Sequence, residues 1–143
     1  MRALLDVNVL IALLDSSHMH NKLVTGWLAD NIDSGWASCP ITQNGCIRIF
    51  SQPGYPNTVP AAQVANRLAE AAQHPLHEFW PDSVSLLHPD TLIWDRVLSS
   101  RQVTDVYLLA LAIKQGGRFV TLDQGIPLDA VADALPKHLV TLA

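Results

Sequence analysis

Short apolar segments alternate with helix-forming segments along the whole chain, and this alternation constrains the fold more than any other feature. The strand-like segments are residues 2–6, 36–39, 77–80, 118–122 and 138–142. The helix-like segments are residues 9–14, 20–32, 41–50, 61–73, 89–98 and 105–115. Strands that alternate with helices predict a parallel sheet covered on both faces, and the right-handed crossover rule leaves few topologies. We therefore expect an α/β fold: a three-layer α/β/α sandwich with a central, mainly parallel five-stranded sheet.

Proline, threonine and glycine residues mark several of the expected helix boundaries. Pro40 lies at a predicted first helical turn, where proline is tolerated because its missing N–H has no partner there. Thr104 is the expected N-cap of a later helix, which Gly116 and Gly117 should end. No repeat, low-complexity segment or linker separates these elements, so a single domain over residues 1–143 is expected.

The composition favours a folded cytoplasmic protein. Of the 143 residues, 49% are hydrophobic and only 15% are charged, which argues against disorder. The longest apolar run is far shorter than the roughly 20 residues that a membrane span needs. The N-terminal segment also lacks the order of parts of a signal peptide. Cys39 and Cys46 have no partners at metal-ligand spacing, and we expect reduced thiols.

The charge balance limits how this chain could bind a polyanion. The formal net charge is −4, whereas a protein that holds nucleic acid mainly by its overall field is usually basic. A phosphate-bearing substrate would therefore have to be held by a few local cations, by a metal ion or by a partner.

Two aspartates follow expected strands directly. Asp6 ends the first strand and interrupts an apolar run, where a carboxylate is costly unless it is solvated, paired or bound to a cation. Asp123 ends the fourth strand, residues 118–122. In an open parallel sheet, the crevice lies beyond the carboxyl ends of the strands where the strand order reverses. Both carboxylates should reach this crevice if the two strands are neighbours.

A third aspartate reaches the same place by a different route. Asp105 lies in the first turn of the helix that precedes the fourth strand. Because that helix runs antiparallel to the strand, its N-terminus lies near the carboxyl edge of the sheet. Three acids that are far apart in sequence are thus expected to converge on one point.

Three converging carboxylates indicate a site for a hard divalent cation. Without a cation they would repel one another and raise at least one pKa. Oxygen ligands suit Mg²⁺ or Mn²⁺, and such a site can activate water and offset charge on a phosphodiester. Each acid also has a plainer interpretation, since Asp105 could serve the helix dipole and Asp123 could start a turn. A structural α/β domain with solvated acids would show no dependence on divalent ions.

Several segments resemble the PIN-domain family. They read LLDVNVLIALL, HMHN, CPITQNGCIRIF and RQVTDVYLLALAIKQGGRFVTLD, followed by a short final strand. The resemblance covers nearly the whole chain in order, and is nearest to the VapC-type toxins of bacterial toxin–antitoxin pairs. It implies a toxin endoribonuclease that depends on Mg²⁺ or Mn²⁺ and hydrolyses RNA phosphodiester bonds.

The resemblance also implies roles for individual residues and partners. Asp6, Asp105 and Asp123 match the acidic positions of the family's active site. Asn8 and Thr104 match polar neighbours that order ligands or water. The family usually forms homodimers, and a small antitoxin silences it by inserting its C-terminal tail into the active-site groove.

One position departs from the family pattern. The family commonly has a glutamate in the first turn of the helix after the second strand, where this chain has Gln43. We expect the Gln43 amide to point into the crevice, where it would bring no charge. This departure leaves an alternative open: a catalytically weak PIN fold that acts as an RNA- or protein-binding module.

Two cations are candidates for contact with RNA or antitoxin. Arg48 follows Gln43 by five positions, and Arg101 precedes Asp105 by four. Two other enzyme classes fit poorly. A receiver domain needs a lysine after a late strand, which VTLDQG lacks, and a haloacid-dehalogenase-type phosphatase needs an acid at position 8.

Overall fold

The computed structural model describes residues 1–143 and contains one five-stranded sheet. The strands are β1 (Ala3–Leu5), β2 (Trp36–Ser38), β3 (His77–Phe79), β4 (Arg118–Thr121) and β5 (Leu139–Thr141). Their order is β3-β2-β1-β4-β5, and all four pairings are parallel. The strand order reverses between β1 and β4, which are direct neighbours, as the placement of the acids requires. The predicted parallel sheet is confirmed.

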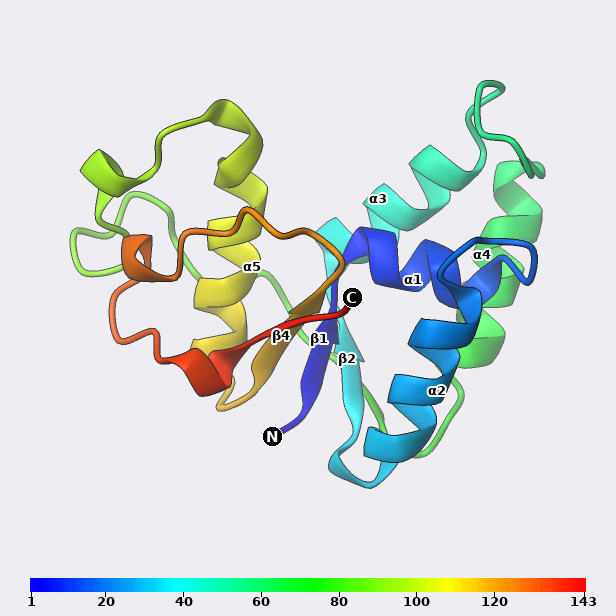
Figure 1. The fold of residues 1–143 in the computed structure, drawn as a ribbon, viewed down its shortest axis with the longest axis horizontal. Coiled ribbons are helices and arrows are strands. Elements are labelled where there is room, and N and C mark those ends of the chain that lie inside the picture. Colours follow the sequence, from blue (N-terminus) through cyan, green and yellow to red (C-terminus); the bar gives the residue numbers. More distant parts are fainter.

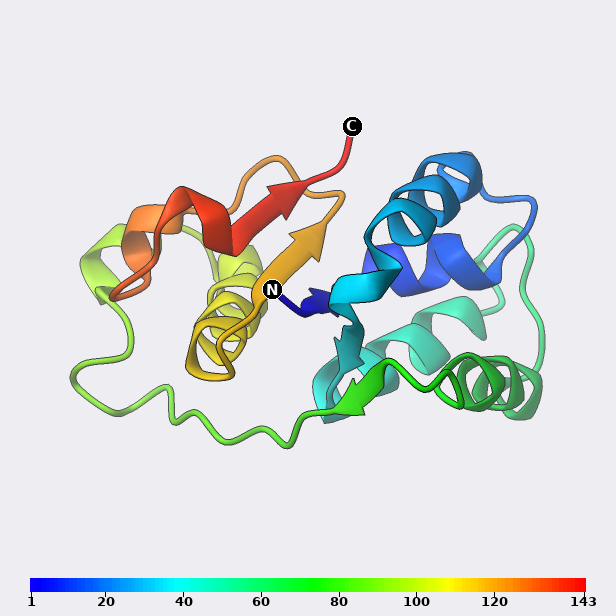
Figure 2. The same cartoon turned by 90° about the horizontal axis from the view of Figure 1, so that it is seen from below.

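Helices cover both faces of the sheet (Figures 1 and 2). The helices are α1 (Val7–Leu14), α2 (Asn21–Asn31), α3 (Pro40–Phe50), α4 (Ala61–Ala71) and α5 (Val103–Lys114). Helix α5 lies on one side, and α1 to α4 lie on the other. Side chains of a strand alternate between the faces, so Leu4 packs with the α5 cluster while Leu5 packs with the α1 cluster. The predicted three-layer sandwich is therefore confirmed.

Helix α5 is buried on all sides, which explains its weakly amphipathic sequence. Every residue from Val106 to Ala112 is buried. A helix that is apolar all round belongs in the interior. It ends where Gly116 takes a positive φ of 71°, a conformation that glycine adopts without the strain of a side chain. It starts one residue before the predicted cap, since Gln102 is the N-cap and Thr104 lies within the first turn.

The helix predicted at residues 89–98 is wrong. The structure has only a single 3₁₀ turn there, Trp94–Arg96. Leu92 instead forms an antiparallel bridge with Val131, and the Ile93 N–H donates to the Ala130 carbonyl at 2.8 Å. This segment belongs to the long connection from the edge strand β3 to the side on which α5 lies (Figure 2). Crossing that distance requires extended backbone, which a helix would shorten.

None of the helices is long and apolar enough to cross a membrane. The two cysteines, Cys39 and Cys46, are both buried and form no disulfide, in agreement with the expected free thiols.

Two glycines make a matched test of the packing. An added Cβ at Gly117 would lie 2.5 Å from the Arg2 carbonyl oxygen and 2.7 Å from the Trp80 ring. We expect Gly117→Ala to lower the free energy of unfolding by about 1–3 kcal/mol through overpacking. Gly26→Ala, in an exposed helical position with no atom within 4 Å, should raise it by about 0.5–1 kcal/mol. Urea denaturation measures both, and equal shifts in the two variants would contradict this packing.

Candidate active site

The first acid is held rigidly where β1 passes into α1. Asp6 is the N-cap of α1, and its carboxylate accepts hydrogen bonds from the Val7 N–H and the Thr121 hydroxyl, both at 2.7 Å. Its side chain is buried, with 6% of the residue exposed. The same Thr121 hydroxyl accepts from the Asp123 N–H at 3.0 Å. One threonine of β4 thus fixes the positions of two acids.

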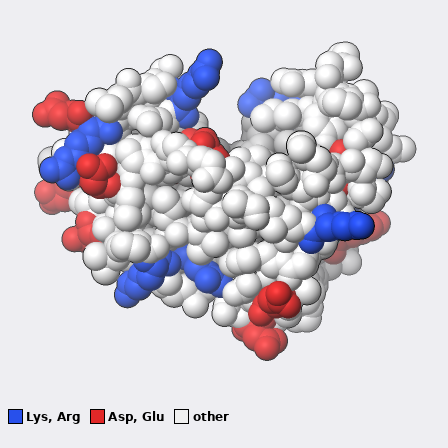
Figure 3. All heavy atoms as spheres, viewed as in Figure 1, with Lys and Arg blue, Asp and Glu red and all other residues white.

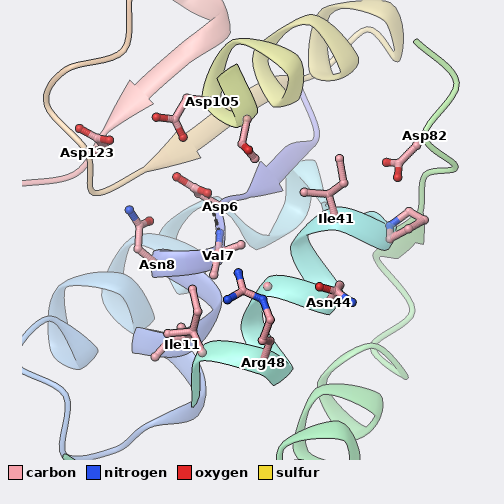
Figure 4. A pocket seen from close by; sticks show the side chains of 14 residues that line it. Asp6, Val7, Asn8, Ile11, Ile41, Asn44, Arg48, Asp82, Asp105 and Asp123 are labelled. Atoms are coloured by element: carbon pink, nitrogen blue, oxygen red, sulfur yellow. Dashed lines mark hydrogen bonds between the residues drawn. The ribbon is translucent and has the colours of Figure 1, made fainter. Parts of the chain in front are cut away.

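The three expected acids line one pocket with a volume of about 600 Å³. Asp105 comes from the first turn of α5, and Asp123 from the turn after β4 (Figure 4). The pocket is lined by 14 residues, namely Asp6, Val7, Asn8, Ile11, Pro40, Ile41, Asn44, Gly45, Arg48, Ile49, Asp82, Thr104, Asp105 and Asp123. Figure 3 shows carboxylate atoms at the base of the hollow between the two helical sides, with cationic side chains on both rims. The structure therefore brings together the acids from three elements.

The electrostatics of the pocket reflect this crowding. Burial, together with the charges of Asp6 and Asp123, raises the pKa of Asp105 to about 7. Burial also raises the pKa of Asp6, although its hydrogen bonds to Thr121 and Val7 act in the opposite direction. The Asp105 carboxyl group is therefore protonated in part of the molecules near neutral pH, as long as no cation compensates the negative charge.

Two polar residues support the acids. The Asn8 carbonyl oxygen accepts from the Leu122 N–H at 3.2 Å, and its amide lies 3.5 Å from the Thr121 hydroxyl. Asn8 thus ties the start of α1 to the end of β4. Thr104 lines the pocket beside Asp105. Both residues line the pocket that contains the acids.

The Gln43 side chain does not point into the pocket, contrary to the sequence-based expectation. Its amide donates to the Ser38 hydroxyl at 3.0 Å, and that hydroxyl lies 2.8 Å from Nε2 of His77. Gln43 therefore faces the β2–β3 side of α3, and the next residue, Asn44, lines the pocket instead. One residue along a helix turns the side chain by about 100°, because a turn takes 3.6 residues.

The two candidate cations differ in position. Arg48 lines the pocket and is the one lysine or arginine among the lining residues. It takes part in no salt bridge, since the structure contains only the pair Arg2–Glu78. Arg101 lies in the exposed 3₁₀ turn before α5 and is not a lining residue.

Asp82 also lines the pocket, although it is not among the site residues predicted from the sequence. It follows the edge strand β3 by three residues, so the argument that placed Asp6 and Asp123 at strand ends applies to it as well. Its place shortly after a strand was the sequence signal that could have identified Asp82 as a pocket residue. Figure 4 shows Asp82 on the far side of Ile41 from the other three acids.

The chemistry of the acids suits a divalent cation of the Mg²⁺ or Mn²⁺ type, although no three of them stand close enough together to form a ready-made ligand group. Asp6, Asp105 and Asp123 offer oxygen atoms only, which is the donor set of hard cations. The raised pKa of Asp105 shows that the uncompensated charge is unfavourable in this place. A bound cation would remove this repulsion.

Comparisons with known proteins place this sequence among related chains. The profile of the PIN domain family matches residues 3–133. The chain is 51% identical over 142 residues to Ribonuclease VapC44 of Mycobacterium tuberculosis, covering 99% of this chain and 100% of that protein. It is 42% identical to Ribonuclease VapC39 of the same species, covering 98% of each chain.

Two solved structures share the fold at low sequence identity. VapBC2 from Rickettsia felis bound to a promoter DNA fragment matches with a TM-score of 0.62 and 14% identity, covering 100% of both chains. Mycobacterium tuberculosis VapC20 matches with a TM-score of 0.60 and 9% identity, covering 86% of this chain and 89% of that chain.

The crowding of the acids predicts a pH-dependent gain in stability for Asp105→Asn. The folded protein holds a proton on Asp105 up to about pH 7, whereas the unfolded chain releases it near 3.8, so stability falls as pH rises through this window. In EDTA, Asp105→Asn should therefore melt at a higher temperature than the wild type at pH 8, with a smaller difference at pH 5. The exposed Asp129→Asn serves as the control in scanning calorimetry. A lower melting temperature for Asp105→Asn at pH 8 would contradict the repulsion.

Proposed function

This chain belongs to the PIN domain family, and we propose that it is a VapC-type toxin that hydrolyses RNA phosphodiester bonds with Mg²⁺ or Mn²⁺. The observation that carries the proposal is the convergence of Asp6, Asp105 and Asp123 on one pocket from three separate elements. The 51% identity with a named ribonuclease over the whole chain supports RNA as the substrate class.

Asp6, Asp105 and Asp123 would hold the cation in this proposal. When bound, a divalent cation lowers the pKa of a water molecule and offsets negative charge on the phosphodiester. The chain's own contribution is to keep the ligands in place. The Thr121 hydroxyl and the Val7 N–H fix the Asp6 carboxylate before any ligand arrives. Such preorganisation matters because small displacements of the ligands reduce the rate steeply.

Arg48 is the residue of the pocket that would hold a substrate phosphate. It lies across the pocket from the acids and has no partner that competes for its guanidinium (Figure 4). A guanidinium binds phosphate through two parallel hydrogen bonds. With a net charge of −4, the chain offers little general attraction for RNA, so this local cation carries more weight.

The position of Gln43 bears on the alternative of a catalytically weak binding module. That alternative rested on an amide that replaces an acid in the crevice. Gln43 hydrogen-bonds Ser38 and does not line the pocket, and the pocket still contains Asp6, Asp105 and Asp123. The arrangement of the remaining acids therefore favours the enzyme.

We also propose an antitoxin partner, a homodimer and a cytoplasmic location. A VapBC complex is among the proteins of the same fold, which supports an antitoxin for this chain. An antitoxin segment that enters the pocket would present cations to its acids. Exposed apolar side chains that a second copy could cover are Phe79, Leu87, Trp94 and Leu98.

Cleavage should depend on the metal and on the acids. The purified protein, free of antitoxin, should cleave RNA with Mg²⁺ or Mn²⁺ and stop in EDTA. Asp6→Asn should lower the cleavage rate at least about 100-fold, since a charged ligand of the cation is lost. Its melting temperature in EDTA should stay equal or rise, because burial raises the pKa of Asp6. Asp33→Asn, far from the pocket, should cleave as the wild type does. Cleavage that persists in EDTA would contradict the proposal.

Removal of the Arg48 guanidinium should weaken substrate binding. Arg48→Ala should raise KM for a short RNA about five- to 50-fold. This factor corresponds to the loss of a charge-assisted hydrogen bond that contributes about 1–2.3 kcal/mol to binding. The same substitution at the exposed Arg96, outside the pocket, is the matched control. Steady-state kinetics at two salt concentrations measure both variants. An unchanged KM for Arg48→Ala would show that Arg48 does not contact RNA.

A further inference from the structure

The wall of the pocket that faces the acids carries a set of side chains with a different chemistry. Helix α3 contributes the apolar Ile41, the amide of Asn44 and the guanidinium of Arg48, and the segment after β3 contributes Asp82. In Figure 4, Ile41 lies between Asp6 and Asp82. The pocket thus extends from the acidic cluster past an apolar surface to a separate carboxylate.

This part of the pocket has room for a nucleotide. The volume of about 600 Å³ lies within the range of small-molecule sites, about 300–1,000 Å³. The acidic cluster occupies one end only, so a base attached to the reacting phosphodiester would extend along the wall formed by α3. An apolar side chain such as Ile41 suits the flat face of a base, and hydrogen-bonding groups beyond it meet the edge of that base.

Asp82 lies near a core residue of α5. Tyr107, which is only 6% exposed, is close enough for the charge of Asp82 to act on its hydroxyl. Burial and the charge of Asp82 raise the pKa of Tyr107. Asp82 itself is exposed toward the pocket and has no arginine or lysine partner. A carboxylate has about four acceptor positions, so Asp82 can accept more than one hydrogen bond from a ligand.

The chemistry of an unpaired carboxylate selects among the four bases. Guanine carries two adjacent N–H donors on its Watson–Crick edge, which match the two oxygens of a carboxylate. Adenine and cytosine carry one amino group beside an acceptor nitrogen, and uracil carries one N–H between two carbonyl oxygens. These acceptors would repel the carboxylate. Building on the proposed ribonuclease function, we propose that Asp82 recognises a guanine base next to the cleaved phosphodiester, with Arg48 on the phosphate.

The binding of mononucleotides tests this guanine subsite without the need for a cation or for cleavage. The probes are the 5′-monophosphates of guanosine, adenosine, cytidine and uridine, titrated in EDTA and followed by NMR chemical shifts of the protein. Guanosine monophosphate should bind at least about fivefold tighter than the other three, the lower end of the discrimination by a bidentate pair. Asp82→Asn should abolish this preference, because an amide offers one acceptor and one donor.

A matched control variant separates the local effect from the loss of charge. Asp95→Asn makes the same change on the same long connection but outside the pocket, and should keep the guanine preference. Equal affinities for the four nucleotides in the wild type, or an unchanged preference in Asp82→Asn, would overturn the subsite.

Cleavage of a random RNA pool provides the second readout. The wild type should cut next to guanine, and Asp82→Asn should lose this enrichment at the sequenced ends. A wild type that cuts without any base preference would also overturn the guanine subsite. A protein that binds guanosine monophosphate selectively but cleaves no RNA would retain the subsite and refute the proposed ribonuclease function instead.

Discussion

The parallel pairing of β1 with β4 is the interaction on which the rest of the site depends. It places the ends of the two strands side by side at the point where the strand order reverses. The Thr121 hydroxyl then bridges the Asp6 carboxylate and the backbone of Asp123. Because the core on both faces of the sheet holds this pairing, the backbone positions of Asp6 and Asp123 stay close together. The stability of the two hydrophobic clusters thus maintains an unfavourable charge arrangement, which a bound cation would stabilise.

The two walls of the pocket come from opposite layers of the sandwich. Helix α5, on one side of the sheet, contributes Asp105, and its Tyr107 lies near Asp82. Helix α3, on the other side, contributes the apolar and cationic groups. This division suggests that the acids and the recognition groups can vary independently. Ile41 and Arg48 of α3 belong to a different element from those that carry the three acids.

Helix α3 shows how tightly its register is constrained. An added Cβ at Gly45 would lie 2.6 Å from a methyl group of Val7, so α3 packs closely on the start of α1. On the opposite side, Gln43 reaches Ser38, which also contacts His77 of the edge strand. These two contacts fix the rotation of the helix. Asn44 and Arg48 consequently face the pocket, and Gln43 faces the sheet.

The layer architecture and the acidic cluster can be predicted from the sequence. Apolar periodicity identifies strands and helices; Asp6 and Asp123 follow strands, and Asp105 lies in the first turn of a helix, so the parallel topology places all three at one edge of the sheet. The opposite wall of the pocket depends on tertiary packing. Helical rotation is set by packing against distant side chains, so the sequence could not tell that Gln43 turns away. Likewise, the path of the connection after β3 depends on where α5 docks, and that docking brings Asp82 to the pocket.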